Sequence, residues 1–138
     1  MAEGAHSDER SSLFIDRSAG ALTVFTFSGG PVLHADWQAL LSEVDTIVRR
    51  DAPFGLIFDA RRGVTLGATQ RREAAEVLRR YERPFRTRCR GLATVSSSTI
   101  VRGLITAVRW VFPAPCPDLI ESDLAVARRW VEERLRNT

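Results

Sequence analysis

Apolar residues recur along the chain in two periods, and these predict alternating strands and helices. Short β-branched and aromatic runs, bounded by glycine, proline or small polar residues, are typical of strands. Five such runs occur, at 13–15, 22–27, 54–58, 91–95 and 118–121. Between them, apolar residues spaced three and four apart predict amphipathic helices over 37–48, 74–85, 100–112 and 124–135.

The order of these elements predicts an α/β fold. The first two runs are separated by Ser18-Ala19-Gly20 and read as an antiparallel hairpin, and after them strands and helices alternate. The predicted order is β-β-α-β-α-β-α-β-α, with four helices and a mostly parallel five-stranded sheet that carries one antiparallel N-terminal strand. The length suits a single domain, which we place at residues 12–138, and the polar segment 1–11 is expected to be a disordered tail.

Helix ends and caps can also be predicted. His34 or Asp36 can open the first helix, and Ser122 or Asp123 can cap the last. The second helix, which follows the central strand, has Thr69 where a cap is wanted, and Pro84 is expected to end or kink it.

The helix predicted over 100–112 has an unusually thin polar stripe. A helix that is apolar around most of its girth is either deeply buried or covered by a partner. Gly103 and Ala107 form a small-residue notch beside Trp110, where another helix or a ligand could approach closely. We therefore mark one candidate ligand or dimer surface here, although plain core packing also fits the pattern; it comprises Arg102, Gly103, Thr106, Ala107 and Trp110.

Charge is concentrated in one part of the chain. All 20 basic residues are arginines and the net charge is only +3, yet residues 61–90 hold ten arginines against three glutamates. A local positive field can attract phosphate, an acidic protein or an anionic membrane surface, and arginines can equally serve only to solvate a helix face. No nucleic-acid-binding motif or aromatic stacking platform accompanies the charge, so specific nucleic-acid binding is not expected.

Cysteines and the N-terminal segment bear on the cellular compartment. Two cysteines, Cys89 and Cys116, are too few for a disulfide-dense secreted scaffold or a structural zinc site. The first twelve residues contain no apolar signal-peptide core, and no apolar run approaches the roughly 18 residues of a membrane span. We expect a cytoplasmic, reduced protein that is not transmembrane.

Candidate functional residues gather after the central strand. Ligands and partners of open α/β sheets collect where strand ends meet helix starts. Asp59 ends the run at 54–58, Arg61 and Arg62 follow it, and Thr69 lies before the paired Arg71 and Arg72. Asp59 could be a site carboxylate or could hydrogen-bond the loop amides.

No catalytic or metal-binding signature accompanies these residues. Asp59 has no second carboxylate or histidine at a readable spacing, and His6 and His34 are isolated. Gly63 and Gly67 do not form a phosphate-binding loop. We therefore expect no catalytic site, no metal site and no cofactor.

Three segments together resemble the STAS domain family, in the SpoIIAA-like group that includes bacterial proteins labelled STAS/SEC14-like. They are 56–61, 69–72 and 101–113, and the resemblance extends from about Ser12 to Leu135. In the family's anti-sigma-factor antagonists, a serine or threonine at a helix start after the central strand is phosphorylated by a partner kinase. The resemblance implies that Thr69 is the corresponding hydroxyl, although the acidic residue and the glycine of that turn are absent here.

The sequence thus leads to two hypotheses. The first is a non-enzymatic regulatory module that docks a protein partner through residues 59–72, with Thr69 as its candidate phosphorylation site; the predicted contact residues are Asp59, Arg61, Arg62, Thr69, Arg71 and Arg72. The alternative is a binding protein for a small apolar or anionic ligand, such as a lipid, beneath the helix over 100–112. A homodimer through that helix is a further expectation.

Overall fold

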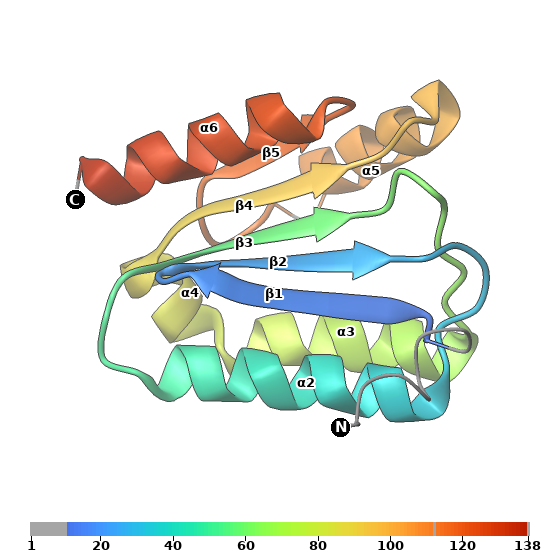
Figure 1. Cartoon of the computed structure of the whole chain (residues 1–138), viewed down its shortest axis with the longest axis horizontal. Coiled ribbons are helices and arrows are strands. Elements are labelled where there is room, and N and C mark those ends of the chain that lie inside the picture. Colours follow the sequence, from blue (N-terminus) through green and yellow to red (C-terminus); the bar gives the residue numbers. More distant parts are fainter. Residues whose placement is uncertain (1–10, 112, 138) are drawn as a thin grey trace.

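The computed structural model describes residues 11–111 and 113–137, and its centre is a five-stranded sheet (Figure 1). The strands are β1 (Leu13–Ala19), β2 (Leu22–Phe27), β3 (Phe54–Asp59), β4 (Cys89–Val95) and β5 (Asp118–Glu121). They lie side by side in chain order, with β1 antiparallel to β2 and each later strand parallel to the one before it. The tight turn between β1 and β2 uses Gly20 at a φ of 70°.

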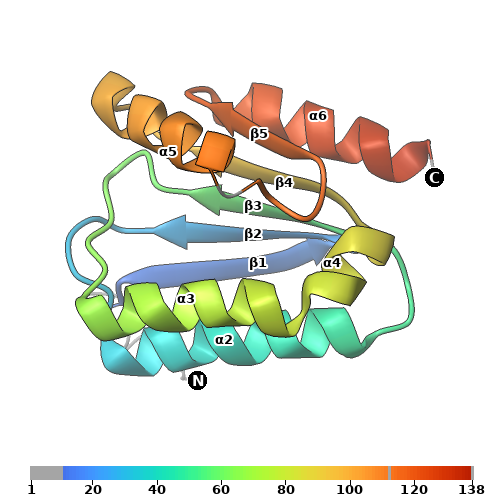
Figure 2. The ribbon, with the colours of Figure 1, turned by 180° about the vertical axis from the view of Figure 1, so that it is seen from behind.

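Helices cover the two faces of the sheet unequally. Three of them, α2 (His34–Arg49), α3 (Ala68–Arg80) and α4 (Glu82–Arg88), pack on one face, whereas α6 (Leu124–Arg136) covers the other. The remaining helix, α5 (Thr99–Val111), lies beside β5 on the side of α3 (Figure 2).

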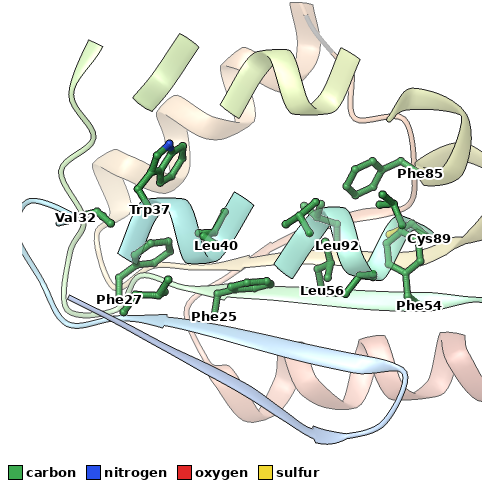
Figure 3. Close-up of a cluster of buried hydrophobic side chains, with 14 residues drawn as sticks. Phe25, Phe27, Val32, Trp37, Leu40, Phe54, Leu56, Phe85, Cys89 and Leu92 are labelled. Atoms are coloured by element: carbon green, nitrogen blue, oxygen red, sulfur yellow. The ribbon is translucent and has the colours of Figure 1, made fainter. Parts of the chain in front are cut away.

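The larger core lies beneath α2, α3 and α4 (Figure 3). Phe25 stacks on Phe58 with ring centroids 5.0 Å apart, and Phe54 meets Phe85 edge-on at 5.6 Å. Trp37 of α2 is also buried here, and its indole N–H donates to Glu73 Oε1 of α3 at 2.8 Å. This bond satisfies the one polar atom of a buried tryptophan and holds the two helices together.

The second core lies beneath α6. Its buried members come from alternate positions of the three central strands and from one face of the helix; they are Leu22, Val24, Ile57, Ala93, Val95, Ala127 and Val131. Because Phe25 and Phe27 point to the other core, β2 has apolar side chains on both faces. This double burial explains why the sequence of β2 does not alternate clearly.

The predicted fold class is confirmed, with one difference in helix number. The second predicted helix is two helices, because α3 ends at Arg80 and α4 begins at Glu82. Pro84 lies in the first turn of α4, where its missing N–H leaves no hydrogen bond unmade. The expected disorder of the N-terminal tail concerns residues 1–11, of which 1–10 lie outside the described residues.

The predicted start of α2 needs correction, whereas the predicted cap of α6 does not. Leu33 is the N-cap of α2, and Asp36 accepts from the backbone N–H and the hydroxyl of Ser12, both at 2.7 Å. Asp36 therefore anchors the start of β1 and does not cap its own helix. At α6 the expectation is confirmed, because the Asp123 carboxylate accepts from the N–H of Ala125 at 2.8 Å.

Candidate functional site

The carboxyl ends of β2, β3 and β4 form the first part of the candidate site. Thr26 pairs with Asp59 and Asp59 with Val95, so the three strands end at one edge of the sheet. A hollow of about 440 Å³ opens there, lined by Thr26, Phe27, Asp59, Arg61, Arg62 and Ser97. Three of the six predicted contact residues thus border one hollow.

Asp59 is buried in this hollow and is fully engaged by Arg61. The residue is only 2% exposed; its two carboxylate oxygens accept from Nε and Nη2 of Arg61, both at 2.9 Å. One oxygen also accepts the Arg61 backbone N–H at 3.1 Å. The hydrogen bonds that Arg61 donates to Asp59 raise the pKa of its guanidinium. Asp59 therefore fixes the loop after β3, and the prediction that it contacts a partner directly needs correction.

Arg62 differs from its neighbour. Its side chain is exposed and, within residues 11–111 and 113–137, makes no hydrogen bond or ion pair. The Arg62 carbonyl packs against Gly29, where a Cβ atom would come within 2.9 Å of that oxygen. The backbone at Arg62 is thus held while its guanidinium remains available.

The start of α3 forms the second part of the candidate site. Its N-cap is Gly67, whose N–H donates to Gln70 Oε1 at 3.0 Å, so the expectation that Thr69 caps the helix is wrong. Thr69 lies in the first turn with its side chain exposed, and Arg72 Nη2 is 3.4 Å from its hydroxyl oxygen. Arg71 is exposed and donates to the Leu66 carbonyl at 2.6 Å.

The loop between the two parts is pinned to the segment before α2. Thr65 forms a bridge with Pro31, and the Thr65 N–H donates to the Gly30 carbonyl at 2.8 Å. Gln70 of α3 donates to the Val32 carbonyl at 3.0 Å. Thr69 and Gln70 border a separate hollow of about 540 Å³ between the starts of α2 and α3. The predicted residues therefore lie along one loop but border two neighbouring hollows.

The helix α5 turns its polar stripe toward the sheet, whereas an ordinary surface helix turns its apolar stripe toward the core. Its least exposed stripe is Arg102, Ile105 and Arg109. Arg109 Nε donates to Asp118 Oδ2 of β5 at 2.9 Å, and Arg102 donates to the Ser96 carbonyl at 2.6 Å. The two arginines therefore hold the polar stripe against the sheet.

The apolar arc of α5 consequently faces solvent. Ile100 is 75% exposed and Trp110 84%, and the other exposed large apolar residues of the helix are Val101, Leu104, Val108 and Val111. Of the two options drawn from its thin polar stripe, deep burial is thus wrong. Four of the five residues marked as a ligand or dimer surface are exposed: Gly103, Thr106, Ala107 and Trp110, whereas Arg102 is half-buried. Phe112 lies outside the described residues.

An apolar cavity of about 310 Å³ lies over the sheet between α2, α3 and α5. Its walls are mostly aliphatic and aromatic side chains from β2, β3, β4, α2, α3, α4 and the loop after β3. Thr94 adds a hydroxyl, and the one charged residue among those lining it is Arg109. The sequence led us to expect a ligand on or beneath α5, but not a cavity walled mainly by the other elements. The sequence shows an apolar stripe on each of the elements that line the cavity. It does not give the distances between those elements in the fold, and the cavity depends on these distances.

The remaining candidates from the sequence are side chains that could bind a metal ion. Among the described residues, no group of three or more histidine, cysteine, aspartate or glutamate side chains could hold a metal ion. His34 borders the hollow between α2 and α3 without an acidic cluster beside it. The arrangement can bind anions through arginines and display a hydroxyl.

Comparison with solved structures decides the fold. A protein of the DUF3478 family with a SpoIIAA-like fold, from Shewanella loihica PV-4, superposes with a TM-score of 0.65; the match covers 86% of this chain and 91% of that one, at 13% identity. The chain has a SpoIIAA-like fold. An anti-sigma factor antagonist from Mycobacterium paratuberculosis matches with a TM-score of 0.53, 18% identity and coverage of 87% and 92%.

The SpoIIAA-like, or STAS-like, assignment confirms the resemblance drawn from the sequence. No protein-family model and no curated protein sequence matches the chain. At these identities the SpoIIAA-like neighbours establish the fold alone. Within the described residues, none of the helices has both the length and the apolar character required to cross a bilayer.

Proposed function

We propose that this protein is a non-enzymatic regulatory module that docks a protein partner through the exposed part of the segment 59–72. The contact residues are Arg61, Arg62, Thr69, Arg71 and Arg72, which we call the cationic loop surface. Asp59 contributes by holding Arg61 and the loop backbone in place. The similarity in fold to an anti-sigma factor antagonist supports a protein-interaction role.

The observation that carries the proposal is the exposed Thr69 hydroxyl in the first turn of α3, beside Arg72 and close to Arg71. The first-turn N–H groups of a helix and nearby arginines favour a phosphate group. Phosphorylation of Thr69 would be tolerated by the fold, and it would cancel positive charge on the contact surface. A partner with an acidic face would then bind the unmodified protein and leave the modified one.

Affinity capture from an extract of the native host tests the docking surface. The immobilised wild-type protein is compared with the double variant Arg71→Glu/Arg72→Glu. The matched control, Arg79→Glu/Arg83→Glu, makes the same charge change on exposed arginines at the far end of α3 and in α4. We expect the first variant to lose a partner that the control retains. Equal recovery by all three proteins would refute the cationic loop surface.

Phosphosite mapping of the protein isolated from its host tests the switch separately. We expect phosphate on Thr69, and the phosphomimetic Thr69→Glu should weaken capture while Thr69→Val leaves it unchanged. An unmodified Thr69 in cells, under conditions that change partner occupancy, would contradict phosphoregulation without affecting the docking surface.

A second candidate function rests on the apolar cavity between α2, α3 and α5. Its volume of about 310 Å³ is at the low end of small-molecule sites, and Arg109 supplies a cation at its wall. The occupant we propose is a small lipid-like molecule with an acyl chain in the cavity. Native mass spectrometry of the purified protein should show added ligand mass, and Ala74→Trp, which fills the cavity, should remove it.

The same measurement separates this function from self-association through α5. A doubled mass with no adduct would assign the exposed apolar arc to a homodimer. An unliganded monomer that binds no added fatty acid would refute the lipid-binding role.

A further inference from the structure

The two cysteines of the chain lie at the same hydrophobic core cluster. Cys89 begins β4 and is 2% exposed within the larger core, whereas Cys116 precedes β5 and is half-buried. Cys116 packs against the same cluster of side chains that contains Cys89. Cys116 is therefore the more exposed of the two residues, whereas Cys89 is enclosed.

A β-bulge and the strand register explain why Cys89 and Cys116 lie at the same core. Phe54 pairs with Cys89 and the next residue, Gly55, pairs with Gly91, so Arg90 is an extra residue in β4. This extra residue turns Cys89 to the face of the sheet that also holds Leu92. On the other side, the Leu92 N–H donates to the Pro117 carbonyl at 2.9 Å, which brings the residue before Pro117 to the start of β4.

The two sulfur atoms also influence each other's protonation. Interaction with the Cys89 side chain lowers the pKa of Cys116, and Arg109 lowers it further, whereas burial and Asp118 oppose the shift. Interaction with Cys116, together with burial, raises the pKa of Cys89, whose thiol donates to the Gly91 carbonyl at 3.6 Å. Cys116 thus carries the larger thiolate fraction and is the less buried residue, and Cys89 is its protonated neighbour.

We propose that Cys89 and Cys116 form a redox modification site, which peroxide converts into a reversible intramolecular disulfide. This goes beyond the docking and lipid-binding roles and does not depend on either. An accessible thiolate beside a second thiol is the arrangement that traps a sulfenic acid as a disulfide.

The reaction balances with hydrogen peroxide as the oxidant. The Cys116 thiolate attacks one peroxide oxygen, the O–O bond breaks, and a sulfenic acid forms while the released hydroxide takes up the proton that Cys116 lost. The Cys89 sulfur then attacks the Cys116 sulfur, the S–O bond breaks, and the leaving hydroxide takes the Cys89 proton. Two thiols are oxidised to one disulfide and peroxide is reduced to two waters.

The disulfide would close a ring that contains the whole of α5. It would tie the connection before β5 to the start of β4, close to the ion pair of Arg109 with Asp118 that holds α5 in place. Because such a crosslink restricts the unfolded chain across about 28 residues, we expect the melting temperature to rise by about 5–10 °C on oxidation.

The test uses the folded wild-type protein and measured amounts of hydrogen peroxide. After removal of the peroxide, the protein is denatured, treated with a maleimide and weighed intact. We expect a mass lower by two hydrogen atoms with no adduct, and two adducts per chain after prior reduction with dithiothreitol. Persistence of two maleimide adducts, oxygen addition without a disulfide, or covalent dimers would each overturn the proposal.

Two single variants show which thiol reacts with peroxide and which one resolves the sulfenic acid. Cys116→Ser changes a half-buried position, and its remaining Cys89 should resist peroxide and keep one adduct. Cys89→Ser should leave a sulfenic acid on Cys116 that a dimedone probe captures. A disulfide that forms in the wild type but lowers its melting temperature would show that the native fold does not hold the two sulfurs in position, and would also refute the site.

Discussion

Gly55 of β3 lies directly beneath α6, and the substitution Gly55→Ala tests how closely that helix approaches the sheet. A Cβ atom at Gly55 would come closer to Val131 Cγ1 than the 3.0 Å limit that real Cβ atoms observe, and within 3.3 Å of Leu135 Cδ1. Val131 is fully buried, and a valine in a helix has essentially one side-chain rotamer, so it cannot turn aside. The helix itself must move.

The expected cost follows from this geometry. Overpacking of a buried contact destabilises a protein by about 1–3 kcal/mol, so we expect that loss for Gly55→Ala. Val131→Ala removes two methyl groups from the same core and should cost about 2–3 kcal/mol. In the double variant the new Cβ occupies the space that the methyl groups left. The double variant should therefore lose less free energy of unfolding than the two single variants added together, by at least about 1 kcal/mol.

Urea denaturation followed by circular dichroism measures these free energies of unfolding. The matched control is Gly103→Ala, the same atom added in the exposed helix α5, where nothing lies within 4 Å. It should stabilise the helix by up to about 1 kcal/mol, because glycine is a poor helix former. Additivity of Gly55→Ala and Val131→Ala within about 0.5 kcal/mol would refute the close approach of α6 to β3.

Three further predictions concern other parts of the molecule. Asp123→Ala removes the N-cap of α6 and should lower the free energy of unfolding by about 1 kcal/mol, measured in urea with Asp123→Asn as a milder control. Arg109→Met breaks the ion pair with Asp118, so backbone amides of α5 should exchange hydrogen faster while those of α2 are unchanged; equal protection would contradict an anchoring role. The lowered pKa of Cys116 predicts that its iodoacetamide alkylation rises at lower pH than for an ordinary thiol, and Cys89→Ala should move that midpoint upward.

The sheet was predictable because each of its strands is a local run with its own boundaries. The apolar runs at 22–27 and 54–58 match β2 and β3 to within a residue, and Asp123 is one of the two caps expected before the last helix. The division of the second predicted helix into α3 and α4 was less visible, because Pro84 fits the first turn of a helix as well as it breaks one.

The candidate site was predictable in place but not in detail. The position of residues 59–72 follows from the parallel topology, which collects strand ends at one edge. The Asp59 carboxylate accepts two hydrogen bonds from the Arg61 side chain. This pairing depends on side-chain geometry within a three-residue turn, which the spacing of residues in the sequence does not reveal. Periodicity likewise showed that α5 has an apolar arc, but only the pairing of Arg109 with Asp118 shows that this arc points outward.

The strand order also has a consequence for synthesis on the ribosome. Since every strand pairs with the one made just before it, the sheet can grow one strand at a time as the nascent chain emerges. The core beneath α2, α3 and α4 draws nearly all its residues from the chain up to Leu92, whereas the opposite core needs Ala127 and Val131. Until α6 has left the exit tunnel, one half-finished face of the sheet stays bare, and a stalled chain would be a natural client for chaperones.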